Sequence, residues 1–112
     1  MIRRIVLFSM ALLLAVPALA RPDAAKLYSD NCAACHAPTR LGGTGPALIP
    51  ESLGRIKGEK LEALIATGRP ATQMQGFGET LTKDDIAALA AYISEPLAQE
   101  PSWTAADIAA TR

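Results

Sequence analysis

The segment Cys32-Ala33-Ala34-Cys35-His36 constrains this chain more strongly than any other stretch of its sequence. Cysteines three residues apart on a helical turn share a face, so both sulfurs can form thioethers with the two vinyl groups of a flat haem. The following residue, His36, can then direct a ring nitrogen at the iron. The motif therefore predicts one covalently bound haem c, held by Cys32, Cys35 and His36.

Paired cysteines also occur in zinc sites and in thiol redox centres. A zinc site needs four ligands, and the chain holds only two cysteines and one histidine, so zinc would have to recruit carboxylates from elsewhere. A thioredoxin-like pair is expected beside a β-α-β pattern, and the sequence shows none. A thiol-disulfide oxidoreductase that uses Cys32 and Cys35 is the competing interpretation of this motif.

Residues 1–20 have the pattern of a secretory signal peptide. Two arginines precede an apolar run over residues 5–16, and Ala18-Leu19-Ala20 is a cleavage signature. The run is shorter than the roughly 20 apolar residues that cross a bilayer, so we expect cleavage before Arg21 and no stable membrane insertion afterwards. An uncleaved membrane anchor is the alternative. Export of the two cysteines places the expected location in the periplasm.

Removing 20 of the 112 residues leaves 92, which is enough for one small domain with a marginal hydrophobic core. A bound haem would add apolar bulk to that core. Two of the 11 basic residues lie in the leader, so nine basic residues face 11 acidic ones and the exported chain carries a formal charge of −2. Nucleic acid is therefore excluded as a partner, because phosphate contacts need a basic patch.

No segment alternates like a strand, so the sequence predicts an all-α fold without internal repeats. Helices are predicted from an N-cap at Asp23 into the cysteines, over residues 59–67 with Gly68 as C-cap, and from an N-cap at Thr82 to before Pro96. The stretch 37–50 is rich in glycine and proline, which favours an irregular loop.

The last of these helices carries an apolar stripe, which predicts core packing. Its members lie at helical spacing: Ile86, Leu89, Ala90 and Ile93. Beyond Pro96 the chain is polar and punctuated by prolines. A short helix is predicted after Thr104, and Trp103 is expected to cover part of the edge of the core.

Met74 is the only methionine outside the leader, and His36 is the only histidine. Two histidines from one chain cannot ligate the iron, so Met74 is predicted as the second axial ligand opposite His36. The competing interpretation is that Met74 fills a gap in the core. His/Met ligation leaves no open position for a substrate, so the sequence predicts an electron carrier without catalytic residues.

At these motifs the chain resembles a class I cytochrome c over residues 23–94. The resemblance rests on C-A-A-C-H at 32–36, G-T-G-P-A-L at 43–48, I-A-T-G at 65–68 with Met74 soon after, and L-T-K-D-D-I-A-A-L-A-A-Y-I at 81–93. It implies a cytochrome c domain over residues 21–95 followed by a tail over 96–112.

The resemblance also implies particular contacts. The first and last helices should cross beside the haem, and the matching positions are Ala24 and Tyr28 against Leu89 and Tyr92. The carbonyl of Pro46 should accept the second imidazole N–H of His36 and fix the ring. The chain departs from the family at Ala24, where glycine is frequent, and at Gln75, where proline commonly follows the ligand methionine.

Two stretches, residues 40–53 and 101–108, are similar to haem-c domains associated with the haem-c/haem-d nitrite reductase. The chain resembles the small monohaem cytochrome that accompanies this reductase, because it stops where the large haem-d domain would begin. The resemblance implies transfer of single electrons between redox proteins in denitrification. The expected transient partners are the nitrite reductase or the proteins that mature its haem d. An accessory electron acceptor in haem d maturation is the alternative function.

Overall fold

The computed structural model describes residues 20–112, so the predicted signal peptide, apart from Ala20, lies outside the described residues. The described part is helical and contains no strand, which confirms the all-α prediction. Six helices follow one another along the chain: α1 (Ala24–Asn31), α2 (Ala33–His36), α3 (Pro50–Leu53), α4 (Glu59–Thr67), α5 (Lys83–Ser94) and α6 (Ala105–Ala109).

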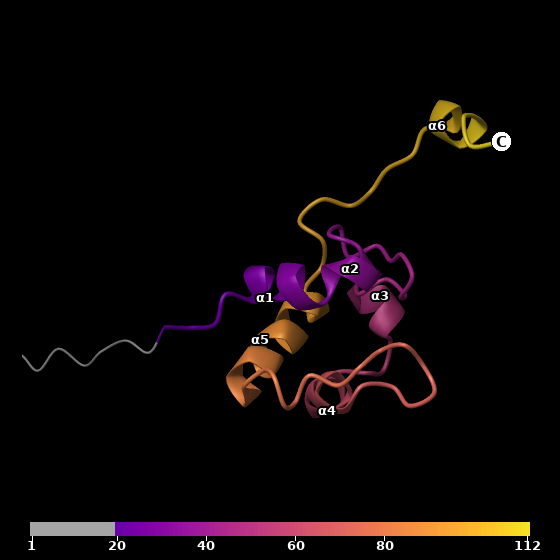
Figure 1. The fold of residues 1–112 in the computed structure, drawn as a ribbon. Coiled ribbons are helices and arrows are strands. Elements are labelled where there is room, and N and C mark those ends of the chain that lie inside the picture. Colours follow the sequence, from indigo (N-terminus) through magenta and orange to yellow (C-terminus); the bar gives the residue numbers. More distant parts are fainter. Residues whose placement is uncertain (1–19) are drawn as a thin grey trace, which may run out of the picture.

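The longest helix, α5, packs against both α1 and α4 (Figure 1). Where α1 meets α5, the rings of Tyr28 and Tyr92 lie with their centroids 5.5 Å apart and their planes tilted by 52°. The crossing of the first helix with this later one, which the resemblance implied, is therefore present. It places α2, which continues from α1 after one residue, next to the core.

The predicted caps are confirmed by hydrogen bonds. Asp23 accepts the backbone N–H of Lys26 at 3.0 Å, and this bond begins α1. Thr82 and Asp85 form a reciprocal capping box at the start of α5, with bonds of 3.0 and 3.1 Å. Local side-chain chemistry thus fixes where these two helices begin.

The core lies between α1, α4 and α5. The predicted stripe is confirmed, because each of its four members on α5 is at most 5% exposed. Tyr28, Leu61, Ile65 and Phe77 complete the buried apolar cluster. This cluster is small, and much of it lies beside the cleft described below.

Irregular backbone connects α2 to α3, as predicted for this stretch, except that its last residue, Pro50, begins α3. Proline suits the first position of a helix because its missing N–H has no intrahelical partner there. The C-cap of α4 is also as predicted, since the N–H of Gly68 donates to the Leu64 carbonyl at 2.8 Å.

The tail carries α6 away from the other helices (Figure 1), and α6 contacts no other helix of residues 20–112. The short helix predicted after Thr104 is confirmed. The expectation that Trp103 covers the edge of the core is wrong, because its side chain is 66% exposed. The proline-punctuated stretch from Pro96 to Pro101 leads the chain outward before the tryptophan is reached. Within residues 20–112 no helix has the length and apolar character needed to cross a membrane.

Candidate functional site

A cleft of about 700 Å³ runs alongside α2, α4 and α5, and all four predicted cofactor-binding residues line it: Cys32, Cys35, His36 and Met74. Its volume lies in the range typical of small-molecule and cofactor sites. Most of its remaining walls are apolar, with side chains from the core and the loops: Leu48, Leu53, Ile56, Leu61, Leu64, Ile65, Phe77, Leu89 and Ile93.

His36 ends α2 with its side chain buried and 8% exposed. Its Nδ1 lies 2.7 Å from the carbonyl oxygen of Pro46. A carbonyl can only accept, so Nδ1 carries a proton and donates, and in the neutral ring this places the lone pair on Nε2. A neutral imidazole in this tautomer is the form that binds a metal. The contact with Pro46 that the resemblance implied is therefore present.

The loop after α2 folds back over the motif, and its backbone packs against the imidazole of His36. The N–H of Gly45 donates to the Cys35 carbonyl at 2.8 Å, and the N–H of Gly42 donates to the His36 carbonyl at 3.0 Å. A Cβ at Gly45 would lie 2.6 Å from Cε1 of His36. The loop can lie this close to the imidazole only because residue 45 has no side chain.

Tyr28 supports the motif from α1. Its hydroxyl donates to the Ala37 carbonyl at 2.8 Å, just past the end of α2. Burial raises the pKa of Tyr28 to about 12, with a further contribution from the negative form of Cys32, so the hydroxyl stays protonated and able to donate at neutral pH. The sequence analysis assigned Tyr28 to the helix crossing and missed this bond.

Arg40 is a buried residue that the sequence analysis did not identify, and it is only 5% exposed. Its Nε donates to the Leu48 carbonyl at 2.9 Å, and its Nη2 donates to the carbonyls of Ile93 and Glu95 at 2.9 and 2.6 Å. The guanidinium also lies over the ring of Tyr92, 5.1 Å from its centroid.

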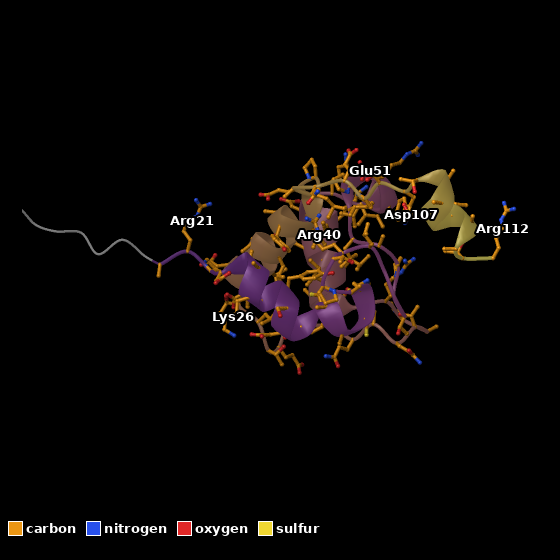
Figure 2. The ribbon with its side chains drawn as sticks, turned by 90° about the horizontal axis from the view of Figure 1, so that it is seen from above. Arg21, Lys26, Arg40, Glu51, Asp107 and Arg112 are labelled. Carbon is orange, nitrogen blue, oxygen red and sulfur yellow. The ribbon has the colours of Figure 1, made fainter. Side chains whose placement is uncertain are left out.

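The position of Arg40 explains its role in the site. Figure 2 shows it among the helices, whereas Arg21, Lys26 and Arg112 lie at the periphery. Its side chain joins the loop that carries the Pro46 carbonyl to the end of α5. Because its partners are backbone carbonyls, no charged partner in the sequence could have indicated this contact.

The two cysteines differ in their surroundings. Cys32 is half-buried and Cys35 is exposed. Burial, followed by the charge of Cys35, raises the pKa of the Cys32 thiol to about 11. Redox-active CxxC pairs depend on a thiol whose pKa is lowered, so this environment opposes the interpretation as a thiol-disulfide oxidoreductase.

Met74 lies half-buried on the wall of the cleft, in the loop between α4 and α5. Its backbone N–H donates to Oγ1 of Thr72 at 3.2 Å, and its carbonyl accepts the N–H of Arg69 at 3.1 Å. A Cβ at Gly68 would lie 2.6 Å from the Met74 carbonyl oxygen. Close backbone packing thus supports this loop although Gln75 stands where proline is common.

A thioether, an imidazole and two thiols on one apolar cleft are the donor set of a c-type haem. In agreement with this, residues 20–93 match the family described as cytochrome c oxidase, cbb3-type, subunit III. The chain belongs to this cytochrome c family. The cytochrome is a class I monohaem protein, and haem c is its cofactor.

Two groups of relatives are similar to the cytochrome. It is 45% identical over 109 residues to a protein named dihydro-heme d1 dehydrogenase from Pseudomonas aeruginosa, a match covering 95% of the cytochrome and 22% of that enzyme. A solved structure of a dihydro-heme d1 dehydrogenase, NirN, in complex with DHE is 48% identical, covers 73% of the cytochrome and 18% of that chain, and has a TM-score of 0.67. The cytochrome thus spans about a fifth of the length of these enzymes.

The second group consists of small cytochromes. Cytochrome c55X from Stutzerimonas stutzeri is 37% identical over 83 residues, and the match covers 74% of both chains. The structure of the c-type cytochrome NirC is 32% identical, with a TM-score of 0.54, and the match covers 64% of the cytochrome and 91% of NirC. The relatives that are matched over most of their own length are therefore named as cytochromes and not as enzymes, in agreement with the predicted electron-carrier function.

Proposed function

We propose that this cytochrome carries single electrons between periplasmic redox proteins of denitrification. The observation that supports this function best is the joint placement of Cys32, Cys35, His36 and Met74 on one apolar cleft. A haem bound there supplies a one-electron iron couple. The surrounding protein binds the haem, fixes the axial imidazole through Pro46 and excludes water from much of the ring.

In this proposal each site residue has one role. Cys32 and Cys35 would attach the haem covalently, while His36 through Nε2 and Met74 through its sulfur would ligate the iron. With His36 and Met74 both ligating, a bound haem would offer no open coordination site to a substrate, so the protein itself would catalyse no reaction. The haem would supply a one-electron couple to partners that bind transiently.

A second candidate function is acceptance of electrons during haem d1 maturation. The 45% identity with a dihydro-haem d1 dehydrogenase over nearly the whole chain favours it. Dehydrogenation of a dihydro-compound releases two electrons and two protons. A one-electron carrier takes one electron per molecule, so two ferric cytochromes would be reduced for each product, and the protons would pass to water.

Stopped-flow mixing of the purified holo-cytochrome with candidate partners separates the two functions. Reduced cytochrome in large excess over haem-c/haem-d nitrite reductase that is fully reoxidised only when nitrite is present would support delivery to that enzyme. Ferric cytochrome that is reduced in a 2:1 ratio to product by a dihydro-haem d1 dehydrogenase with its substrate would support the maturation function. Exchange with neither enzyme would refute both partner assignments.

The proposed periplasmic location has its own test. Expression with its leader and with haem-attachment machinery should yield a chain that begins at Arg21 and carries one haem. Intact-mass analysis of the periplasmic fraction measures both properties. A mass equal to the bare chain from residue 21 would refute covalent attachment, and a mass that includes residues 1–20 would refute cleavage.

A further inference from the structure

The tail, residues 96–112, carries two of the three exposed large hydrophobic side chains of the described residues, Trp103 and Ile108. They are 66% and 51% exposed. Trp103 precedes α6 and Ile108 lies within it, and α6 contacts no other helix of residues 20–112. Scattered exposed apolar residues are common, but these two belong to one short ordered segment. The cytochrome domain itself therefore does not cover them.

The segment is ordered by its own local contacts. Thr104 and Asp107 form a reciprocal capping box, in which the N–H of Thr104 donates to Asp107 at 2.8 Å and the N–H of Asp107 donates to Thr104 at 3.2 Å. Trp103 precedes the N-cap and Ile108 is the fourth helical residue, which are the two positions of a hydrophobic staple. Both side chains thus belong to one end of a preformed turn.

Such a turn is marginal alone, because five helical residues do not offset the cost of nucleation. Contact with another surface would stabilise it, and its existing order would lower the entropy lost on binding. Aromatic and aliphatic anchors of this kind provide most of the binding energy at protein interfaces. The tail therefore has the properties of an interface segment whose partner lies outside the described chain.

The comparisons indicate the partner. The match to the Pseudomonas aeruginosa dehydrogenase covers 95% of this chain, so it extends through Trp103. The same match takes in only 22% of the dehydrogenase, so the equivalent of this tail belongs there to a much longer polypeptide. In that enzyme, the part of the polypeptide outside the matched stretch is the surface that such a tail could contact.

Charge argues against a membrane as the partner. The tail contains the acidic residues Glu100 and Asp107, and Arg112 is its only basic residue. Segments that lie on anionic membranes carry lysine and arginine on their polar face. A protein surface with an apolar pocket fits the composition of the tail better.

We propose that residues 96–112 form a docking segment, anchored by Trp103 and Ile108, for the part of a dihydro-haem d1 dehydrogenase-like enzyme that lies outside the matched stretch. This inference deepens the proposed function and rests on its partner assignment. The tail holds the cytochrome domain beside the enzyme while the haem edge stays free to exchange electrons.

The test uses the intact Pseudomonas aeruginosa dehydrogenase, in which residues 21–112 of this chain replace the part of the matched stretch that corresponds to them. The segment of the enzyme that matches residues 1–20 is kept for export, and a protease site is inserted after Arg112. After cleavage, gel filtration shows whether haem c still elutes with the larger fragment. We expect co-elution with the parent tail. The double variant Trp103→Ser/Ile108→Ser should weaken the association about tenfold or more, as loss of interface anchors does.

Leu41→Ser is the matched control, because Leu41 is the third exposed large hydrophobic residue and lies outside the tail. It should leave co-elution unchanged. Equal retention of the parent and of the double variant would overturn the proposal. So would dimerisation of the free holo-cytochrome that the double variant abolishes, because the tail would then bind a second copy.

A second measurement does not depend on cleavage. Hydrogen exchange at the amides of residues 104–111 should be slowed about tenfold or more in the uncleaved chimera, relative to the free holo-cytochrome, because docking protects the helix. Equal exchange would overturn the docking segment. Protected amides in a chimera whose haem c is not reduced by dihydro-haem d1 would count against the proposed electron transfer and not against the docking.

Discussion

Gly45 lies against the imidazole of His36, and an added Cβ would come 2.6 Å from Cε1 and 2.8 Å from Nδ1. Gly45→Ala should therefore displace the ring and weaken its bond to the Pro46 carbonyl. We expect a loss of about 1–3 kcal/mol in the free energy of unfolding, as for other overpacked sites, together with a changed visible spectrum. Chemical denaturation and absorbance measure both. Thr44→Ala, at the exposed neighbouring residue, is the control. Equal stability and equal spectra for the two variants would contradict the close approach of Gly45 to the His36 ring.

Met74→Ala tests the proposed second iron ligand directly. The variant should keep its haem, because the proposed thioethers to Cys32 and Cys35 do not involve Met74. It should lose the weak far-red band of ferric iron bound to methionine sulfur, its potential should fall, and its reduced form should bind carbon monoxide readily. Gln75→Ala is the control at the adjacent side chain. A parent protein that binds carbon monoxide as readily as Met74→Ala would show that Met74 only fills the core.

Tyr28 gives the fold a dependence on alkaline pH. Its pKa is about 12 in the folded chain against a usual value of 10.0, with burial as the main cause. Between these values the unfolded chain loses the proton while the folded chain keeps it. The stabilisation is therefore complete below pH 10 and is lost as the pH rises towards 12, by about 3 kcal/mol at most.

Denaturation midpoints of the holoprotein at pH 9 and pH 11.5 measure the part of this loss that burial causes, because a Cys32 bound to haem carries no charge that could raise the pKa of Tyr28 further. Tyr28→Phe should reduce the difference between the two pH values, although it also removes the bond to Ala37 and so lowers stability at neutral pH by about 1 kcal/mol. Tyr92→Phe, in the ring that Tyr28 contacts, is the control and should keep most of the parent's difference, because burial and not the charge of Tyr92 is the main cause of the raised pKa of Tyr28. If the midpoints of Tyr28→Phe at pH 9 and pH 11.5 differ as much as those of the parent, other titrating groups cause the loss of stability at alkaline pH.

At the scale of elements, α5 organises the core through one face. Leu89 is its most buried member, at 1% exposed, and also lines the cleft. Leu89→Ala should lower the free energy of unfolding by about 2–5 kcal/mol, with little change in the absorption bands of the folded fraction. Urea denaturation checks the loss. Ala91→Ser, on the exposed side of the same helix, is the control and should have almost no effect on stability. Equal urea midpoints for Leu89→Ala and the parent would show that the apolar stripe does not form the core.

The helices that could be predicted from the sequence are those whose signals are local. Asp23 and Thr82 begin α1 and α5 through bonds to residues three positions away, and Gly68 closes α4 through the residue four before it. The stripe on α5 repeats with the helical period, so its burial could be read directly. The four proposed haem-binding residues were chosen from the sequence through a short motif and a count of possible ligands, and the structure places all four on one cleft.

The features that were missed depend on contacts between distant residues. Arg40 donates to the carbonyls of Ile93 and Glu95, which lie 53 and 55 residues further along the chain. Every residue offers a carbonyl, so no sequence pattern identifies these partners. The direction of the tail was misjudged for a related reason. Trp103 has a large apolar side chain of the kind that packs in cores, but whether it reaches the core depends on the path of the chain from Pro96 to Pro101.

At the scale of the whole molecule, the small net charge of the chain predicts a weak electrostatic contribution to association with its proposed partners. The chain from residue 21 carries nine basic and 11 acidic residues, a formal charge of −2 before the haem propionates are counted. Electrostatic steering accelerates association more strongly when both partners present more charge, and added salt removes only that contribution. An apolar contact around the haem edge and along the tail would change little with salt.

We therefore expect the second-order rate of electron transfer with a nitrite reductase or dihydro-haem d1 dehydrogenase to vary weakly with ionic strength. Stopped-flow rates of the holo-cytochrome at about 10 mM and about 150 mM salt, where the screening length falls from roughly 30 to 8 Å, measure this dependence. A double variant, Glu59→Lys/Glu62→Lys, raises the net charge to +2 without altering a buried side chain, and should steepen it. A many-fold fall in the parent's rate over this range would show that a concentrated charged patch, and not an apolar contact, guides the encounter.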